Sequence, residues 1–147
     1  MNKKTIMKIL LFAVPFMAFV FATTNNSVQL VNTLTGETQY GSYFTMLGES
    51  AAAICPFLAA LCSISAMVFS ALYLFRKKKG FLKTTTWSGF AGACIAVIPV
   101  AARGEVLLLP NVIFPILMMI HFFICAFSKN LKLDEKDENH GPRLERH

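Results

Sequence analysis

The sequence predicts an all-α membrane protein, a four-helix transmembrane bundle with a small extracellular β-hairpin-like loop between its first two helices. Three observations support this prediction. The 147 residues are 55% hydrophobic and only 15% charged, whereas about a quarter of the residues in an ordinary soluble domain carry charge. Four apolar runs are each long enough to cross a hydrocarbon core of about 30 Å. Almost all of the Lys and Arg side chains lie on one side of these runs.

The four predicted spans are separated by clusters of charge. They cover residues 6–23, 51–75, 84–102 and 106–128, and together they form one transmembrane domain over residues 1–128. Threonines and glycines dilute the third span, so a re-entrant or tilted segment is the alternative there. The first span has a rival interpretation as a signal peptide, because its end, Val20-Phe21-Ala22, resembles a signal-peptidase site. We expect the first span to be retained.

The positions of the basic residues predict the orientation. Thirteen of the fourteen Lys and Arg precede span one or lie in its first turn, lie between spans two and three, or follow span four, and only Arg103 lies on the other side. Because basic residues near span ends mark the cytoplasmic side, both termini are predicted to be cytoplasmic, with the spans in the plasma membrane.

The turn between spans two and three is the predicted inner basic anchor, which contacts the lipid bilayer. Its cations are Arg76, Lys77, Lys78, Lys79 and Lys83. The formal net charge of +6 therefore indicates topology and attraction to anionic lipid. We expect no nucleic-acid partner, since the basic residues flank the spans.

The outer loop, residues 24–50, contains two runs with β propensity on either side of Gly36, which can supply a turn. This pattern predicts a small hairpin that packs on the helices or on a partner, because an isolated two-stranded hairpin is marginal in water. Its predicted contact surface consists of Tyr40, Tyr43, Phe44 and Met46. The charged tail, residues 129–147, lacks apolar periodicity, so we expect it to be disordered, or a frayed extension of the last helix, in the cytoplasm.

Small residues recur at four-residue spacing in spans two and three, which places each set on one helix face. Lipid gives little hydrophobic force between helices, so close backbone approach at small residues favours helix association. The pattern predicts a packing seam that serves either the fold of one chain or oligomerisation. The seam residues are Ala59, Ser63, Ala66, Ser70, Ser88, Gly89, Gly92, Ala93 and Ala96.

One histidine lies inside a predicted span. It belongs to a polar stripe on one face of the fourth span, because the members follow helical offsets. The stripe residues are Asn111, Met118, His121 and Cys125. Since intramembrane ionisable residues face the bundle interior or a wet cavity, the stripe is predicted to point inward.

Three interpretations of His121 are open. In the first, a neutral imidazole holds helices together by hydrogen bonding Ser63, Ser65, Ser88 or a backbone carbonyl. In the second, the histidine titrates within a proton or ion path. In the third, thioether, imidazole and thiolate groups of the stripe bind a soft metal such as Cu(I). We favour the first interpretation and expect no metal and no other cofactor.

The sequence gives no sign of catalysis. No catalytic motif or paired carboxylate lies within the spans, and the four cysteines form no C-x-x-C and avoid the outer loop. The four-span plan with a larger first outer loop resembles the general layout of the claudin family. The loop lacks the Trp-Gly-Leu-Trp run and the cysteine pair that mark that family, so no family is assigned.

The predicted function is therefore that of a small non-enzymatic tetraspan membrane component. It assembles with itself or binds another membrane protein through helix packing and its outer loop. An oligomeric channel or small transporter, with a polar path along the fourth span, is the alternative.

Overall fold

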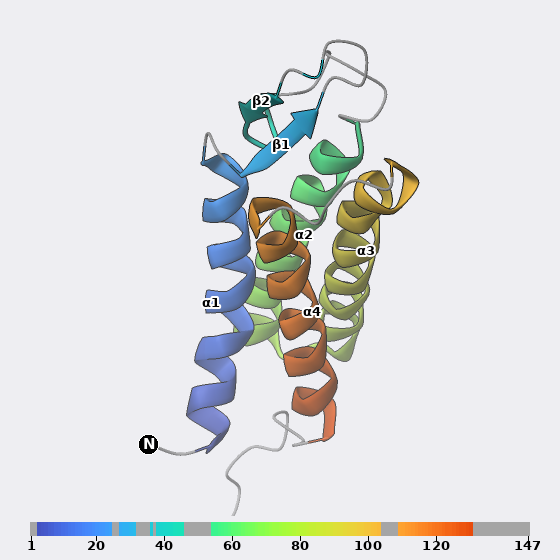
Figure 1. The fold of residues 1–147 in the computed structure, drawn as a ribbon. Helices are drawn as coiled ribbons and strands as arrows, with labels where there is room; N and C mark the ends of the chain where they lie inside the picture. The colour runs from blue at the N-terminus through green and yellow to red at the C-terminus, as the bar shows by residue number, and fades with distance from the viewer. Residues whose placement is uncertain are drawn as a thin grey trace, which may run out of the picture.

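Four long helices pack side by side in the protein (Figure 1). The computed structural model describes residues 3–24, 27–31, 36, 38–45, 54–103 and 109–130. The helices within these residues are α1 (Lys3–Thr23), α2 (Ile54–Arg76), α3 (Lys79–Arg103) and α4 (Leu109–Asn130). Each contains a stretch long and apolar enough to cross a membrane. The prediction of four packed helices of this kind is confirmed.

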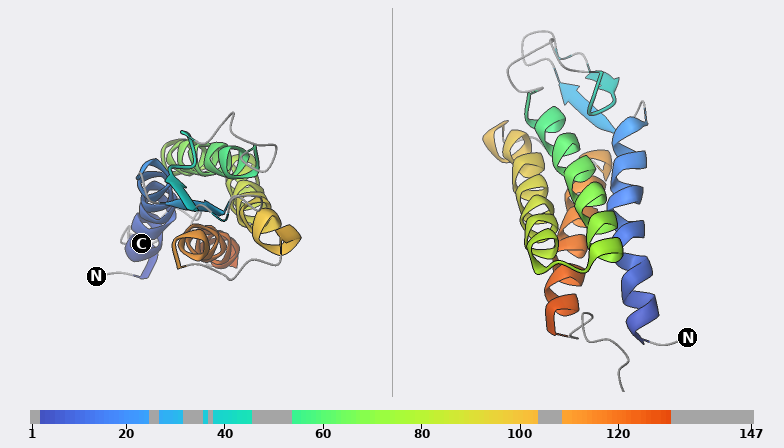
Figure 2. Two further views of the ribbon diagram at one scale, coloured as in Figure 1. Left: turned by 45° about the horizontal axis from the view of Figure 1, so that its top comes forward. Right: turned by 180° about the vertical axis from the view of Figure 1, so that it is seen from behind.

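The helices form a ring around a shared interior. α2 packs most extensively on α3, α3 packs on α4, and α1 packs on both α4 and α2. The tilted view in Figure 2 shows the four helices surrounding the centre of the bundle. Helices that are neighbours in the chain are thus neighbours in space, and the first helix closes the ring against the last.

The third span is one continuous helix, α3, of 25 residues, so it is not the re-entrant segment that was the alternative. The basic turn before it is shorter than predicted, because only Lys77 and Lys78 separate α2 from α3. Lys79 and Lys83, which the sequence placed in the turn, belong to α3. Lysine is a good helix former and its long side chain carries the charge away from an apolar surface, so a helix can begin inside a basic run.

Lys77 makes this short turn possible. Its φ angle is 50°, in the left-handed region that commonly ends a helix. Its N–H donates to the carbonyl oxygen of Tyr73 at 2.8 Å, and this bond satisfies a carbonyl in the last turn of α2.

Two short strands lie beyond the end of α1 (Figure 1). β1 (Val28–Val31) pairs antiparallel with β2 (Thr38–Gly41), with Val28 opposite Gly41. Between the strands, Gly36 has a φ angle of 69°, which glycine adopts without steric cost. We call this end of the bundle the hairpin end.

The opposite end, which we call the basic end, holds the start of α1, the α2–α3 turn and the end of α4 (Figure 1). Every described Lys and Arg except Arg103 lies there. These residues are Lys3, Lys4, Lys8, Arg76, Lys77, Lys78, Lys79, Lys83 and Lys129.

Many of the buried residues of the bundle are small, and many large apolar side chains are exposed. Alanines such as Ala18 and Ala66 are fully buried, whereas Met17, Phe123 and Phe127 are each more than half exposed. Soluble bundles bury their large apolar side chains and expose polar ones. An exterior of large apolar side chains with small residues at the helix contacts is the arrangement found in lipid, and it suggests a membrane-embedded protein.

Candidate functional site

The described members of the polar stripe lie on the interior face of α4. Met118, His121 and Cys125 are buried, and Phe114, on the same face and nearer the hairpin end, is buried as well. The side chain of Asn111 lies outside the described residues. The structure therefore brings three of the four stripe residues into the bundle, where they meet α3.

Thr85 of α3 is the centre of a hydrogen-bonded cluster that joins three helices. Its hydroxyl oxygen lies 2.8 Å from the carbonyl oxygen of Ala66, 2.9 Å from the Ser70 hydroxyl and 3.1 Å from Nε2 of His121. All of these residues are buried. α2, α3 and α4 thus meet at a single oxygen atom. We call Thr85, Ala66, Ser70 and His121 the Thr85 cluster.

Donor and acceptor capacities determine where the protons of the Thr85 cluster lie. A carbonyl oxygen only accepts, so Thr85 donates its one hydroxyl proton to Ala66. The two lone pairs of the same oxygen then accept from the Ser70 hydroxyl and from His121 Nε2. A neutral imidazole with its proton on Nε2 satisfies all three contacts, and the remaining ring nitrogen, Nδ1, is then an acceptor.

Two buried polar side-chain atoms of the described residues have no hydrogen-bond partner, Nδ1 of His121 and Oγ of Ser128. Both belong to α4, and their spacing of seven residues places them on one helix face. Cys125 lies between them on this face, with its Sγ 3.5 Å from His121 Nε2. The inner face of α4 towards the basic end is therefore polar, and some of its hydrogen-bonding atoms have no partner among the described residues.

Sequence reasoning named Ser63, Ser65 and Ser88 as partners of His121 and missed Thr85. Ser63 instead donates to a carbonyl of its own helix at 2.7 Å, and Ser65 and Ser88 hydrogen-bond each other at 3.0 Å. Thr85 lies four residues, one helical turn, before Gly89 and seven residues, two turns, before Gly92, on the same face of α3. That spacing is the signal that could have identified it.

The seam residues lie inside the single chain. All of them are buried except Ser88, which is half-buried. A Cβ atom at Gly92 would lie 2.7 Å from Cε of Met118 and 3.0 Å from Cβ of Cys62, and one at Gly89 would lie 3.0 Å from Cδ2 of His121. Glycine therefore lets α3 approach α2 and α4 together and press against the imidazole. This packing agrees with one of the two predicted uses of the seam, the fold of one chain, and oligomerisation through the seam stays a prediction.

Tyr43, a predicted contact residue of the outer loop, is part of the core. It is 2% exposed, and its ring centroid lies 4.6 Å from that of Phe114. Its N–H donates to the carbonyl oxygen of Ala22 at 3.1 Å, and burial raises the pKa of its phenol. Tyr43 thus attaches the loop to the ends of α1 and α4, which leaves it little surface for a partner.

The other predicted loop contacts differ among themselves. Phe44 is half-buried, with its ring edge-on to the rings of Phe19 and Phe57, so it packs on α1 and α2. Tyr40 is 59% exposed. Met46 lies outside the described residues. Of the three described members, Tyr40 alone keeps most of its side chain on the surface.

The four thiols and the five cations of the basic anchor are the remaining groups with functional chemistry. All four cysteines are free, and among the described residues no group of three His, Cys, Asp or Glu side chains could hold a metal ion. The five cations of the basic anchor are all exposed. They are therefore available to groups outside the chain.

The fold and this cluster define a class: a bundle of four helices able to cross a membrane, held together by small residues and by a buried imidazole–hydroxyl cluster. Comparison of the chain with protein-family models, with curated proteins and with solved structures gave no match.

Proposed function

We propose that this chain is a small non-enzymatic integral protein of the plasma membrane that acts by binding another membrane protein or a second copy of itself. In this proposal all four helices span the bilayer, and both termini lie in the cytoplasm. The hairpin lies outside the cell and forms the binding surface.

The membrane location is supported by the exterior of the bundle and by its charge. Exposed Phe, Ile, Met and Val side chains occur on all four helices, and an apolar surface of that extent is unfavourable in water. The gathering of the described cations at the basic end matches the rule that Lys and Arg flank spans on the cytoplasmic side. The hairpin, at the opposite end, then lies outside.

The binding role is supported by the observation that the chain's own side chains fill the interior of the bundle. The hydroxyl groups of the Thr85 cluster hydrogen-bond to other groups of the same chain. The seam is occupied by the chain's own helices, and Phe114 and Tyr43 fill the interior at the hairpin end. An interior filled in this way favours function at the outer surface. The hairpin presents Tyr40, and Tyr43 and Phe44 hold the adjoining segment on the helices.

Photocrosslinking in the native membrane tests this proposal. A photoreactive amino acid at position 40 should give adducts with a membrane protein or with a second copy of the chain. The same group at Ile120, an exposed position in the middle of α4, should give mainly lipid adducts. Protein adducts at neither position, or equally at both, would reject the hairpin as the binding surface.

A channel or small transporter remains the second candidate, and one observation favours it. The unpartnered His121 Nδ1 and Ser128 Oγ lie on one buried face of α4, and unsatisfied polar atoms are typical of a wet path. Proteoliposomes that contain a pH-sensitive dye test this candidate. The binding proposal predicts no proton flux above that of empty vesicles, whereas flux that His121→Ala abolishes would support the path.

A further inference from the structure

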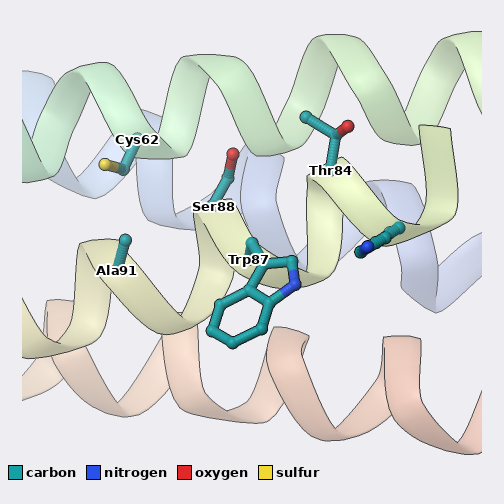
Figure 3. Close-up of a pocket in the computed structure, with 6 residues that line it drawn as sticks. Cys62, Thr84, Trp87, Ser88 and Ala91 are labelled. Atoms are coloured by element: carbon teal, nitrogen blue, oxygen red, sulfur yellow. The ribbon is translucent and has the colours of Figure 1, made fainter. Parts of the chain in front are cut away.

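A groove on the outside of the bundle, between α2 and α3, has no role in the proposed function. It has a volume of about 410 Å³ and opens to the exterior. Cys62 lies on the α2 side, and Thr84, Trp87, Ser88 and Ala91 lie on α3 (Figure 3). Lys83 completes the lining at the basic end of the groove.

The lining changes from charged to apolar along α3. Lys83, Trp87 and Ala91 are successive at four-residue spacing, so they follow one helix face over about 12 Å. Trp87 is 60% exposed, and tryptophan prefers the boundary between headgroups and acyl chains. Lysine side chains near span ends extend to the headgroups. The groove therefore has a headgroup end at Lys83 and an acyl-chain end at Ala91 and Cys62.

The headgroup end is strongly positive. Lys83 lies in the second turn of α3, close along the chain to the exposed Arg76, Lys77, Lys78 and Lys79. The first turn of α3 adds the partial positive charge of a helix N-terminus. Exposed cations at this density attract anionic headgroups of the inner leaflet.

The wall of the groove also offers a hydroxyl group. Ser88 and Ser65 hydrogen-bond each other at 3.0 Å, and either can be the donor. Whichever hydroxyl accepts keeps its own proton. With Ser65 as the donor, the Ser88 proton is available to an ester or phosphate oxygen in the groove.

We infer that this groove binds one anionic phospholipid of the inner leaflet, with its phosphate at Lys83 and the basic anchor and one acyl chain along Trp87, Ala91 and Cys62. Charge complementarity selects the headgroup, and the small side chains of Ala91 and Cys62 leave space for the chain. This inference rests on the proposed membrane location, but it is independent of the proposed binding by the hairpin.

Trp87 provides the test, because it is the single tryptophan of the protein. The full chain is reconstituted in vesicles of equal parts dioleoyl phosphatidylglycerol and dioleoyl phosphatidylcholine. Either the first or the second lipid carries brominated acyl chains, which quench tryptophan fluorescence on contact. We expect the anionic lipid to occupy the groove about fivefold more often than its neutral counterpart, the ratio that about 1 kcal/mol of attraction gives, and to quench correspondingly more.

Two pairs of variants separate a groove site from general attraction to the basic end. Lys83→Gln should reduce the preference and Lys129→Gln, on α4, should not. Ala91→Leu fills the acyl-chain end and should abolish the preference, whereas Cys94→Leu, at an exposed position outside the groove, should preserve it. A preference that survives Ala91→Leu would overturn the groove site.

The remaining outcomes distinguish this inference from the proposed membrane location. Equal quenching by the two brominated lipids would reject a selective lipid site while leaving the spans in the bilayer. Quenching by neither lipid would show that Trp87 does not contact acyl chains, and both proposals would then be wrong.

Discussion

Thr85 shows how one hydroxyl can pair with one ring nitrogen of a buried histidine. It donates to Ala66, accepts from Ser70 and accepts from His121, so all three of its hydrogen-bonding positions are used. In a medium without water, a neutral imidazole needs such a partner to be buried at low cost. The arrangement accounts for His121 as a structural residue and leaves its Nδ1 as the one unexplained atom of the ring.

We expect Thr85→Val to destabilise the bundle by about 1 kcal/mol, a value typical of interhelical hydrogen bonds in membranes. Valine keeps the shape of threonine but leaves the Ser70 hydroxyl and His121 Nε2 without their acceptor. Thermal unfolding in detergent micelles measures the effect. Thr84→Val is the matched control, because the Thr84 hydroxyl is exposed and donates only to a carbonyl of its own helix. Equal midpoints for the two variants would show that the cluster does not stabilise the bundle.

At the scale of the helix, α3 is the element on which the bundle depends. It contacts α2 through the seam and α4 through Gly89, Gly92 and Thr85. Its composition explains why it has the lowest mean hydropathy of the four candidate spans. The threonines and glycines that weaken its apolar signal are the residues that permit close contact.

Gly92→Leu should destabilise the single chain by about 1–3 kcal/mol, the usual cost of overpacking. A side chain there meets Met118, whose methyl can move, and Cβ of Cys62, which cannot move without its helix. Gly80→Leu is the control on the same helix, because nothing lies within 4 Å of a Cβ at that position. The unfolding midpoint at low protein concentration in detergent reports the effect on one chain. A loss that appears only as dissociation of oligomers would place the seam between chains instead.

At the scale of the whole molecule, the two ends of the bundle differ in chemistry. The basic end concentrates the described cations, and the hairpin end carries the strands, Tyr40 and the aromatic contact between Tyr43 and Phe114. In the proposed membrane location, this difference favours one orientation, with the basic end in the cytoplasm.

Cysteine labelling of intact cells checks that direction. A membrane-impermeant maleimide should label Thr38→Cys, at an exposed position of β2, without permeabilisation. Lys78→Cys, exposed in the α2–α3 turn, should react only after the membrane is opened. The unmodified chain serves as the background, because its exposed Cys94 lies on the apolar exterior of α3. Labelling of position 78 in intact cells would reverse the proposed topology.

The number and approximate extent of the helices could be predicted because apolar runs and flanking charges are local properties of the sequence. The helix ends could not, as Lys79 and Lys83 show, because a basic run is compatible with both a loop and the start of a helix. The inward face of α4 follows from helical spacing alone. The identity of the histidine's partner does not, since it depends on how α3 is rotated and shifted against α4, and that is determined by the glycines and their neighbours.

The outer loop shows a second limit of the same kind. Tyr40 and Tyr43 look alike in the sequence as aromatic residues of a polar loop, yet one is exposed and the other is buried. The difference depends on whether the chain, after leaving β2, turns back onto α1. The N–H of Tyr43 bonds to a carbonyl at the end of α1, and this contact between distant segments has no signature in either segment alone.

That contact has a consequence for the maturation of the protein. The carbonyl of Ala22 accepts the Tyr43 N–H at 3.1 Å, and Ala22 is fully buried, so the outer loop is fixed at the very residue that precedes the possible cleavage site. Cleavage after Ala22 would remove the helix that closes the ring between α4 and α2. The ring of four helices and the anchorage of the loop by Tyr43 therefore both require the uncleaved chain.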